Sequence, residues 1–162
     1  MNRSRTSAGL LMFRGPKGRL EVLLVHPGGP YFQNKDDGAW TIPKGESAEG
    51  EDLLSRARME FEEELGLSPM GDWIALGSVK QKGGKIVHAW AFEGDLGDDF
   101  KFVSNTFEME WPPQSGEIKR FPEVDQARFF PMELARSKIN AAQIVLLDRL
   151  FELLESCREG GA

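Results

Sequence analysis

The feature that most constrains the fold is the segment from Trp40 to Leu67, where a glycine-bearing loop leads into a stretch rich in glutamate. At about 100° per residue, its apolar side chains fall in one sector of a helix, formed by Leu53, Leu54, Ala57, Phe61 and Leu65. This pattern predicts an amphipathic helix whose apolar stripe must be buried against another layer. A fold with at least two layers follows.

Three glutamates of this helix are predicted to crowd one half-buried edge of the stripe. With Glu60 at zero, Glu64 lies near 40° and Glu63 near −60°, whereas Glu62 lies near 200° and faces water, at about 100° per residue. Carboxylates at this spacing repel one another, so a cation is needed. Mg²⁺ takes several carboxylates together with water and phosphate oxygens. An acidic surface helix paired with lysines elsewhere is the alternative interpretation.

The spacing around these glutamates resembles the Nudix box, the signature of the Nudix hydrolase family. Gly45 is followed by five residues and Glu51, then by seven residues and the run MEFEEELGL, which starts at Met59 and includes Gly66. Every signature position is matched except the arginine, whose place Met59 occupies. The resemblance implies cleavage of a nucleoside diphosphate linked to another moiety.

The resemblance also implies a set of metal ligands for Mg²⁺ or Mn²⁺, namely the Gly45 carbonyl and the side chains of Glu60, Glu63 and Glu64. Glu51 would be the partner of the signature arginine, which Met59 cannot replace. By helix geometry neither Arg56 nor Arg58 is expected to lie on the right bearing for Glu51. We therefore expect Glu51 to find another cation or to remain solvated.

A further carboxylate is needed to accept a proton from the attacking water. Glu63 is one candidate, because its neighbours on the helix are better placed as direct ligands. Related enzymes supply another glutamate shortly before the strand that leads to the closing helices, and Glu123 fits that place best. The reserves are Glu108, Glu110 and Glu117, and a solvated loop glutamate is the alternative for each.

The rest of the chain predicts an α+β fold with a mixed sheet between helices, an α/β/α sandwich. Two strands at 7–14 and 20–27 are expected to form a hairpin, and two more flank the turn at 80–85. Further elements are expected as a strand at 100–112, a short strand leading through Pro131 into a helix, and a closing helix at 141–156. Residues 1–162 are expected to form a single domain, and the family resemblance implies the same architecture.

The flanks of the box narrow the substrate class. The runs WTIPKGE and GED resemble those of asymmetric diadenosine tetraphosphate hydrolases, which implies that Lys44 touches a phosphate. Tyr31 and Phe32, in a loop dense in glycine and proline, either stack on a nucleobase or pack back onto the domain. Lys82 and its neighbouring lysines either meet a polyphosphate or form a solubilising turn.

Three functions are consistent with this sequence. The first is metal-dependent hydrolysis of a dinucleoside polyphosphate, with diadenosine tetraphosphate giving ATP and AMP. The second is a nucleoside triphosphate pyrophosphohydrolase that sanitises the nucleotide pool. The third is a nucleotide-sensing module with weakened catalysis, suggested by Met59; the intact glutamates argue against it, because an unused acidic cluster only destabilises the fold.

Composition excludes some partners. The net charge of −6 argues against binding a nucleic acid polymer, which requires clustered Lys and Arg. The single cysteine, Cys157, cannot form an intrachain disulfide, which fits a reducing compartment. With no run of about eighteen apolar residues and no leader pattern, we expect a cytoplasmic protein without a membrane partner, acting on a small nucleotide polyphosphate.

Overall fold

The structure is a computed structural model that describes residues 5–16, 18–97 and 100–159, with no account of the side chains of 157–159, including Cys157. Within this part, one mixed sheet contains β1 (Thr6–Arg14), β2 (Glu21–Pro27), β3 (Lys44–Glu46), β4 (Ile74–Lys80), β5 (Ile86–Glu93) and β8 (Val124–Pro131). The strand order is β4-β5-β1-β2-β8, and β3 pairs with the first half of β1. Only the β1–β5 pair is parallel among these pairings, so the predicted mixed sheet is confirmed.

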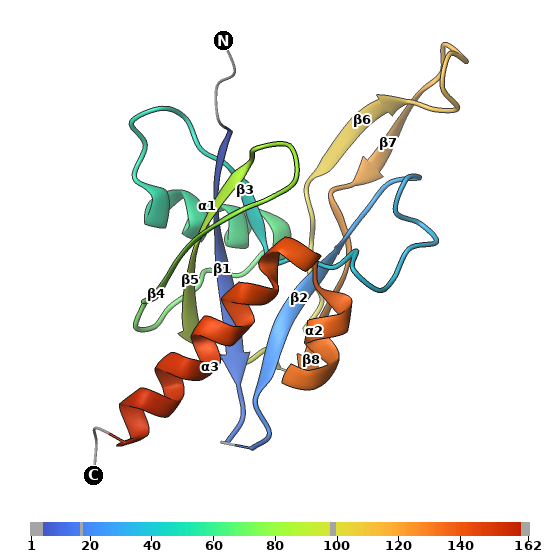
Figure 1. Cartoon of the computed structure of the whole chain (residues 1–162). Coiled ribbons are helices and arrows are strands. Elements are labelled where there is room, and N and C mark those ends of the chain that lie inside the picture. Colours follow the sequence, from blue (N-terminus) through green and yellow to red (C-terminus); the bar gives the residue numbers. More distant parts are fainter. Residues whose placement is uncertain (1–4, 17, 98–99, 160–162) are drawn as a thin grey trace.

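Helices cover both faces of this sheet, as Figure 1 shows. Helix α1 (Leu53–Leu65) packs on one face, and α2 (Met132–Lys138) and α3 (Ile144–Glu159) pack on the other. A short 3-10 turn at Ala141–Gln143 precedes α3. The predicted α/β/α sandwich is confirmed.

Alternate residues of β1 supply two separate cores, because successive side chains of a strand point to opposite faces. Leu10 and Met12 belong to the core under α1, whereas Leu11 and Phe13 belong to the core under α2 and α3. Strand β1 is therefore buried on both sides, which explains its nearly continuous apolar sequence.

The two ends of α1 are set by its sequence. The side chain of Asp52 accepts a hydrogen bond from the backbone N–H of Ser55 at 3.0 Å and caps the first turn. At the other end Gly66 has a positive φ of 71°, and its N–H donates to the Glu62 carbonyl at 2.7 Å. The glycine of the box is thus the residue that lets the helix stop at this place.

The prediction of one strand at 100–112 is wrong. Only Thr106–Glu110 is a strand, β6, and it pairs with β7 (Ile118–Pro122), which the sequence analysis did not foresee. Phe100 and Phe102 instead pack as loop residues against the core under α1. The β6–β7 hairpin extends away from the main sheet (Figure 1).

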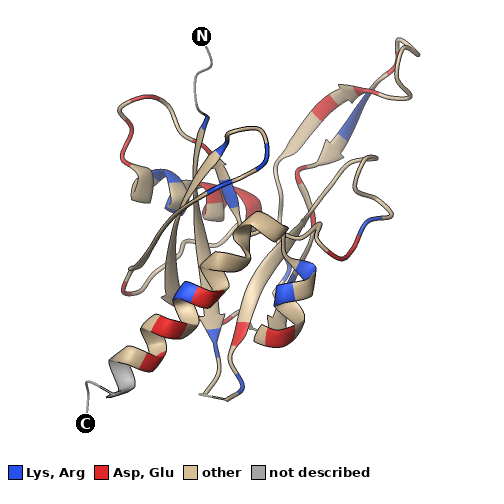
Figure 2. Ribbon diagram, viewed as in Figure 1, with Lys and Arg blue, Asp and Glu red and all other residues tan. Residues whose placement is uncertain are grey.

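Charges of both signs are interspersed over the elements, with acidic positions along both α1 and α3 (Figure 2). Of the helices in the described residues, none is long and apolar enough to span a membrane.

Candidate active site

Gly45 and Glu60 are in close contact where β3 passes under α1. Strand β3 pairs with β1, with Gly45 opposite Ala8, and this register turns Gly45 towards the helix. A side-chain carbon added at Gly45 would overlap the carboxyl group of Glu60. The glycine at the start of the box is therefore required by the close approach of a carboxylate to the backbone.

Glu64 is the most unusual group of the site. It is only 8% exposed, and its Oε2 atom has no hydrogen-bond partner. Burial raises the pKa of Glu64 to about 8, with a further contribution from Glu60 and an opposing one from Lys44. A backbone hydrogen bond from Lys44 also acts to lower this pKa, but the buried oxygen without a partner is unfavourable unless a cation or a proton compensates it.

Glu60 lies beside this buried group, and Glu63 lies close enough to Glu60 to act on its charge. Burial, followed by the charge of Glu63, raises the pKa of Glu60, and Arg56 opposes the rise. Glu62 is exposed, as predicted; Glu63 is also exposed and does not lie on the half-buried edge expected from the helix wheel.

These carboxylates fit a divalent ion by chemistry, although they do not form a complete cage by themselves. Among the described residues, no three His, Cys, Asp or Glu side chains gather tightly enough to hold a metal alone. The unpartnered Oε2 of Glu64 and the Gly45–Glu60 contact nevertheless offer hard oxygen donors at one place. A metal at such a site takes its remaining ligands from water and phosphate, as Mg²⁺ commonly does.

Glu123 reaches this cluster from a distant part of the sequence. It lies in the bend between β7 and β8, is exposed, and its charge helps to raise the pKa values of Glu60 and Glu64. Its backbone is fixed by hydrogen bonds to Asn105 and Gly28. The three reserve glutamates lie on the hairpin, and each has a partner there. Glu108 binds Arg120, Glu110 accepts a hydrogen bond from the Gln114 N–H, and Glu117 forms an ion pair with Lys119.

Lys44 lies beside the cluster, but its side chain starts on the other face of the sheet. Lys44 pairs with Gly9 of β1. A side-chain carbon added at Gly9 would overlap both the Lys44 Cβ and Ile42, and Ile42 belongs to the core under α2 and α3, so Lys44 starts on that face. Burial and the nearby Lys85 lower the pKa of Lys44 to about 8. Lys85, one of the turn lysines predicted either to meet a polyphosphate or to solubilise the turn, also lies 3.7 Å from Glu46.

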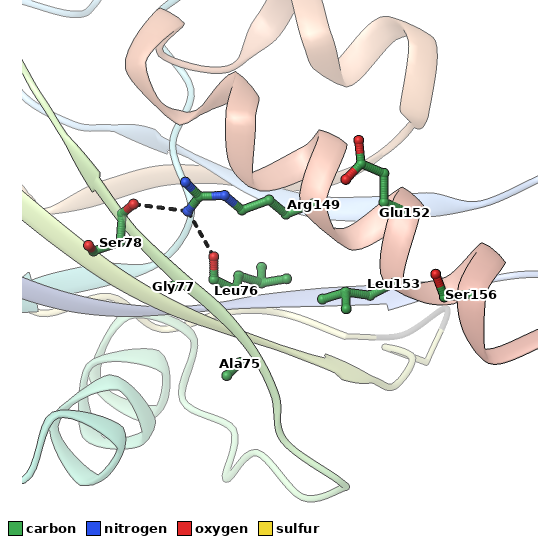
Figure 3. A pocket seen from close by; sticks show the side chains of 8 residues that line it. All are labelled: Ala75, Leu76, Gly77, Ser78, Arg149, Glu152, Leu153 and Ser156. Carbon is green, nitrogen blue, oxygen red and sulfur yellow. Dashed lines mark hydrogen bonds between the residues drawn. The ribbon is translucent and has the colours of Figure 1, made fainter.

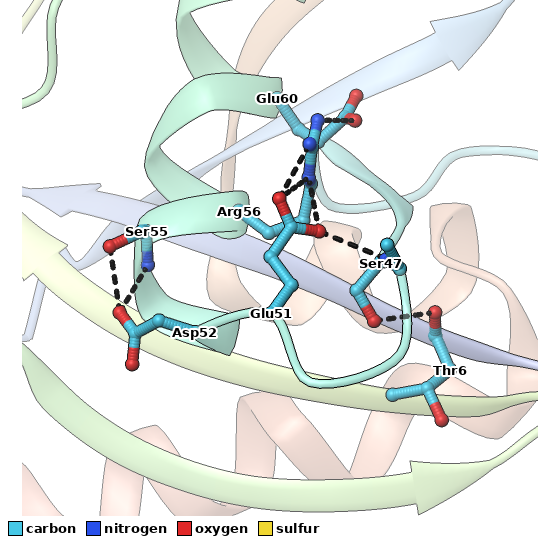
Figure 4. A network of polar contacts seen from close by, with 8 residues as sticks. Thr6, Ser47, Glu51, Asp52, Ser55, Arg56 and Glu60 are labelled. Carbon is cyan, nitrogen blue, oxygen red and sulfur yellow. Dashed lines mark hydrogen bonds and ion pairs between the residues drawn. The ribbon is translucent and has the colours of Figure 1, made fainter.

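Glu51 has a cationic partner, which is one of the two outcomes expected for it. Arg56 Nε donates to both Glu51 oxygens at 3.0 Å, and Nη2 donates to Oε2 at 2.6 Å (Figure 4). Arg56 holds the pKa of Glu51 below its usual value. The prediction that Arg56 lies on the wrong bearing is wrong, because a helix wheel places only the start of a side chain and arginine is long.

The NUDIX domain family matches residues 3–150 of the chain. The chain belongs to the Nudix family. This confirms the family, the fold and the class of enzyme predicted from the box, a Nudix-type pyrophosphohydrolase. A comparison with curated proteins gave no significant match.

Solved structures show the same Nudix fold at low identity. The binary complex of Caenorhabditis elegans Ap4A hydrolase is 21% identical, with 93% of this chain and 98% of that chain covered and a TM-score of 0.67. The NUDIX domain of Shewanella oneidensis NrtR complexed with ADP ribose is 15% identical, with 95% and 90% covered and a TM-score of 0.63. The MutT protein from Methanosarcina mazei is 20% identical, with 92% and 94% covered and a TM-score of 0.57.

The loop after β2 of this Nudix domain carries the two aromatic candidates. Tyr31 is 58% exposed, and its ring meets the edge of Trp111 from the hairpin at a centroid distance of 5.3 Å. Phe32 is exposed beneath the ammonium group of Lys35, 5.5 Å from the ring centroid. Tyr31 thus contacts the hairpin, and Trp111 is an aromatic neighbour that the sequence analysis missed.

His26 fixes the start of this loop through packing and hydrogen bonds. The ring is buried against Trp40, and its two nitrogens lie 2.7 Å from Asp125 Oδ1 and from the Lys35 carbonyl. Lys82, by contrast, is exposed in the β4–β5 turn.

A separate cavity of about 600 Å³ lies between β4 and α3 (Figure 3). Its Arg149 Nη1 donates to the carbonyls of Leu76 and Ser78 on the edge strand at 2.9 Å. The guanidinium group thus covers the open edge of the sheet. This cavity is lined from α3, on the face opposite α1, and does not include the box glutamates.

Proposed function

We propose that this Nudix enzyme hydrolyses a phosphoanhydride bond of a dinucleoside polyphosphate, with diadenosine tetraphosphate giving ATP and AMP. The observation that carries the hydrolytic part is the buried, unpartnered Oε2 of Glu64 beside Glu60. The substrate class is supported by the box flanks WTIPKGE and GED and by the likeness to the C. elegans Ap4A hydrolase structure.

The Gly45 carbonyl and the side chains of Glu60, Glu63 and Glu64 are the proposed ligands for Mg²⁺ or Mn²⁺. When bound, such an ion neutralises phosphate charge and makes water more acidic. The protein's contribution is to hold Glu64 desolvated and to press Glu60 against Gly45.

The proton of the attacking water is proposed to pass to Glu123 or Glu63. Both carboxylates are exposed, so each can meet water, and each lies close enough to raise the pKa of Glu60. Glu123 comes from outside α1 and can approach a bound substrate from the side of the hairpin.

Lys44 is proposed to bind a phosphate, with Lys85 as a second contact. The ammonium groups of Lys44 and Lys85 repel each other, and that of Lys44 is desolvated, so a bound anion would stabilise both charges. Tyr31 and Phe32 are proposed to stack on a nucleobase, since both remain exposed, and Lys82 to meet a distal phosphate of a long substrate.

The runner-up substrate is a nucleoside triphosphate, cleaved to monophosphate and pyrophosphate. A nucleotide-sensing role is less well supported than it was from sequence, because Arg56 provides the ion pair that Met59 cannot. We further propose that residues 1–162 form one domain, which acts in the cytoplasm on a small nucleotide and not on a nucleic acid polymer.

A nucleotide panel tests this function. With Mg²⁺ or Mn²⁺ we expect turnover of diadenosine tetraphosphate to ATP and AMP, and loss of turnover on chelation. Hydrolysis in water labelled with heavy oxygen identifies the phosphorus attacked. Activity on nucleoside triphosphates alone would identify the protein as a nucleoside triphosphate pyrophosphohydrolase. If no nucleotide is turned over, the nucleotide-sensing role is the remaining function.

A further inference from the structure

One arginine connects the box loop to the box helix. Besides its three hydrogen bonds to Glu51, Arg56 donates from Nη1 to Glu60 Oε1 at 3.2 Å (Figure 4). Glu51 also accepts from the backbone N–H of Ala48 at 3.0 Å, which ties down the turn of the loop. The planar guanidinium group therefore spans a loop anchor and a proposed metal ligand at once.

These ion pairs are partly shielded from water. The side chains of Arg56, Glu51 and Glu60 are 20%, 22% and 13% exposed. Fully exposed ion pairs contribute little to stability, and shielding from water strengthens the attraction between opposite charges. The network is therefore able to hold Glu60 in one orientation.

Position 56 suits this double contact better than position 59. Arg56 and Glu60 are four residues apart, so their side chains lie on one side of the helix. Position 59 is rotated about 100° from Glu60, and Met59 is 46% exposed in a shallow groove with Ser55 and Glu62. An arginine at 56 can hold both carboxylates together.

We propose that Arg56 is a positioning residue of this active site: it fixes the loop through Glu51 and holds the Glu60 carboxylate against Gly45. The arginine that pairs with Glu51 thus lies at position 56 in this chain, three residues before position 59, where the family signature has its arginine. This inference rests on the proposed function, in which Glu60 is a metal ligand.

Mn²⁺ binding to the nucleotide-free protein provides the first test, by isothermal titration calorimetry. Arg56→Met should weaken Mn²⁺ binding by about 10- to 100-fold, the usual cost of losing a residue that orients a metal ligand. Arg58→Met is the matched control, since Arg58 is exposed with its guanidinium 5.2 Å above the Trp73 ring, and it should bind Mn²⁺ as the unchanged protein does.

Two further variants separate positioning from folding. Arg56→Lys keeps the charge but loses the fork, and should fall between Arg56→Met and the unchanged protein in Mn²⁺ affinity while keeping the same far-UV circular dichroism. The double variant Glu51→Gln with Arg56→Met should lose less Mn²⁺ affinity than the two single variants lose together, because each single change already breaks the same Arg56–Glu51 ion pair.

Met59→Arg gives the sharpest outcome. Because Glu51 already has a partner, we expect turnover and Mn²⁺ affinity to stay within about twofold. A clear gain would overturn the assignment to Arg56, as would an Arg56→Met protein that binds Mn²⁺ and turns over normally. If the unchanged protein itself binds no Mn²⁺, the metal-dependent function fails and the role of Arg56 fails with it.

Discussion

The two faces of the central sheet are covered by helices that bury different chemistry. On one face α3 contributes Leu146, Leu147 and Leu150, all fully buried in an apolar core. On the other face α1 buries Phe61 and Leu65 in the same way, but it also buries a carboxylate, Glu64.

This difference separates stability from activity within one sandwich. A buried leucine side chain contributes about 1.5–3 kcal/mol to folding, whereas a buried carboxylate with an unsatisfied oxygen opposes folding or takes up a proton. The face under α3 can therefore be optimised for packing alone. The face under α1 retains an unfavourable group, which becomes favourable only when a cation arrives.

The largest expected effect is that of Glu64→Gln. The change removes a negative charge at constant volume, so hydrolysis should fall by more than the roughly 100-fold that loss of an outer-shell partner costs. The metal-free variant should also be more resistant to urea at pH 8, because no charge needs to be buried. Turnover close to normal would remove Glu64 from the site and erase the contrast between the faces.

Leu147→Ala should lower stability and leave turnover unchanged, the opposite of Glu64→Gln. Removing a fully buried leucine under α3 should lower the free energy of unfolding by about 2–5 kcal/mol. Turnover per folded molecule, measured well below the midpoint of thermal unfolding, should be unchanged. A loss of turnover without a loss of stability would show that the two faces are coupled.

The pH dependence of stability should also distinguish the faces. The pKa of Glu64 is raised from 4.5 to about 8 in the folded protein, so between these pH values the folded state holds a proton that the unfolded state has released. The free energy of unfolding of metal-free protein should therefore fall as pH rises through this window, by a few kcal/mol at most. Urea titrations in a chelator should show this fall, and Glu64→Gln should make it shallower.

Gly45→Ala should have a smaller effect on turnover than Glu64→Gln. The added methyl group displaces the Glu60 carboxylate without removing it, and we expect a loss of about 10- to 100-fold in turnover. Gly97→Ala is the control, because an added carbon there meets open space. Equal turnover in both variants would show that the position of Glu60 is unimportant.

Glu62→Gln should be nearly silent in both turnover and urea stability. Glu62 is exposed on the side of α1 away from the sheet, and exposed charges contribute little. A marked loss of turnover would mean that the catalytic groups lie on the solvent side of α1 with Glu62, and not on the side that faces Gly45.

The sequence by itself determined the box helix, its apolar stripe and the family. Helical periodicity fixes which residues share a face, so the burial of Phe61 and Glu64 and the exposure of Glu62 were predictable. The helix ends at Asp52 and Gly66 are equally local, because capping depends on residues a few positions apart. The strands at 7–14 and 20–27 followed from their apolar runs.

Only the tertiary structure decided which charged groups meet. The pairing of Arg56 with Glu51 and Glu60 depends on the path of the loop and on side-chain length, which a wheel of Cβ directions does not contain. The approach of Glu123 to Glu64 depends on the β6–β7 hairpin, whose second strand has no periodic pattern. Local sequence fixes the shape of each element, whereas long-range packing fixes the electrostatics between them.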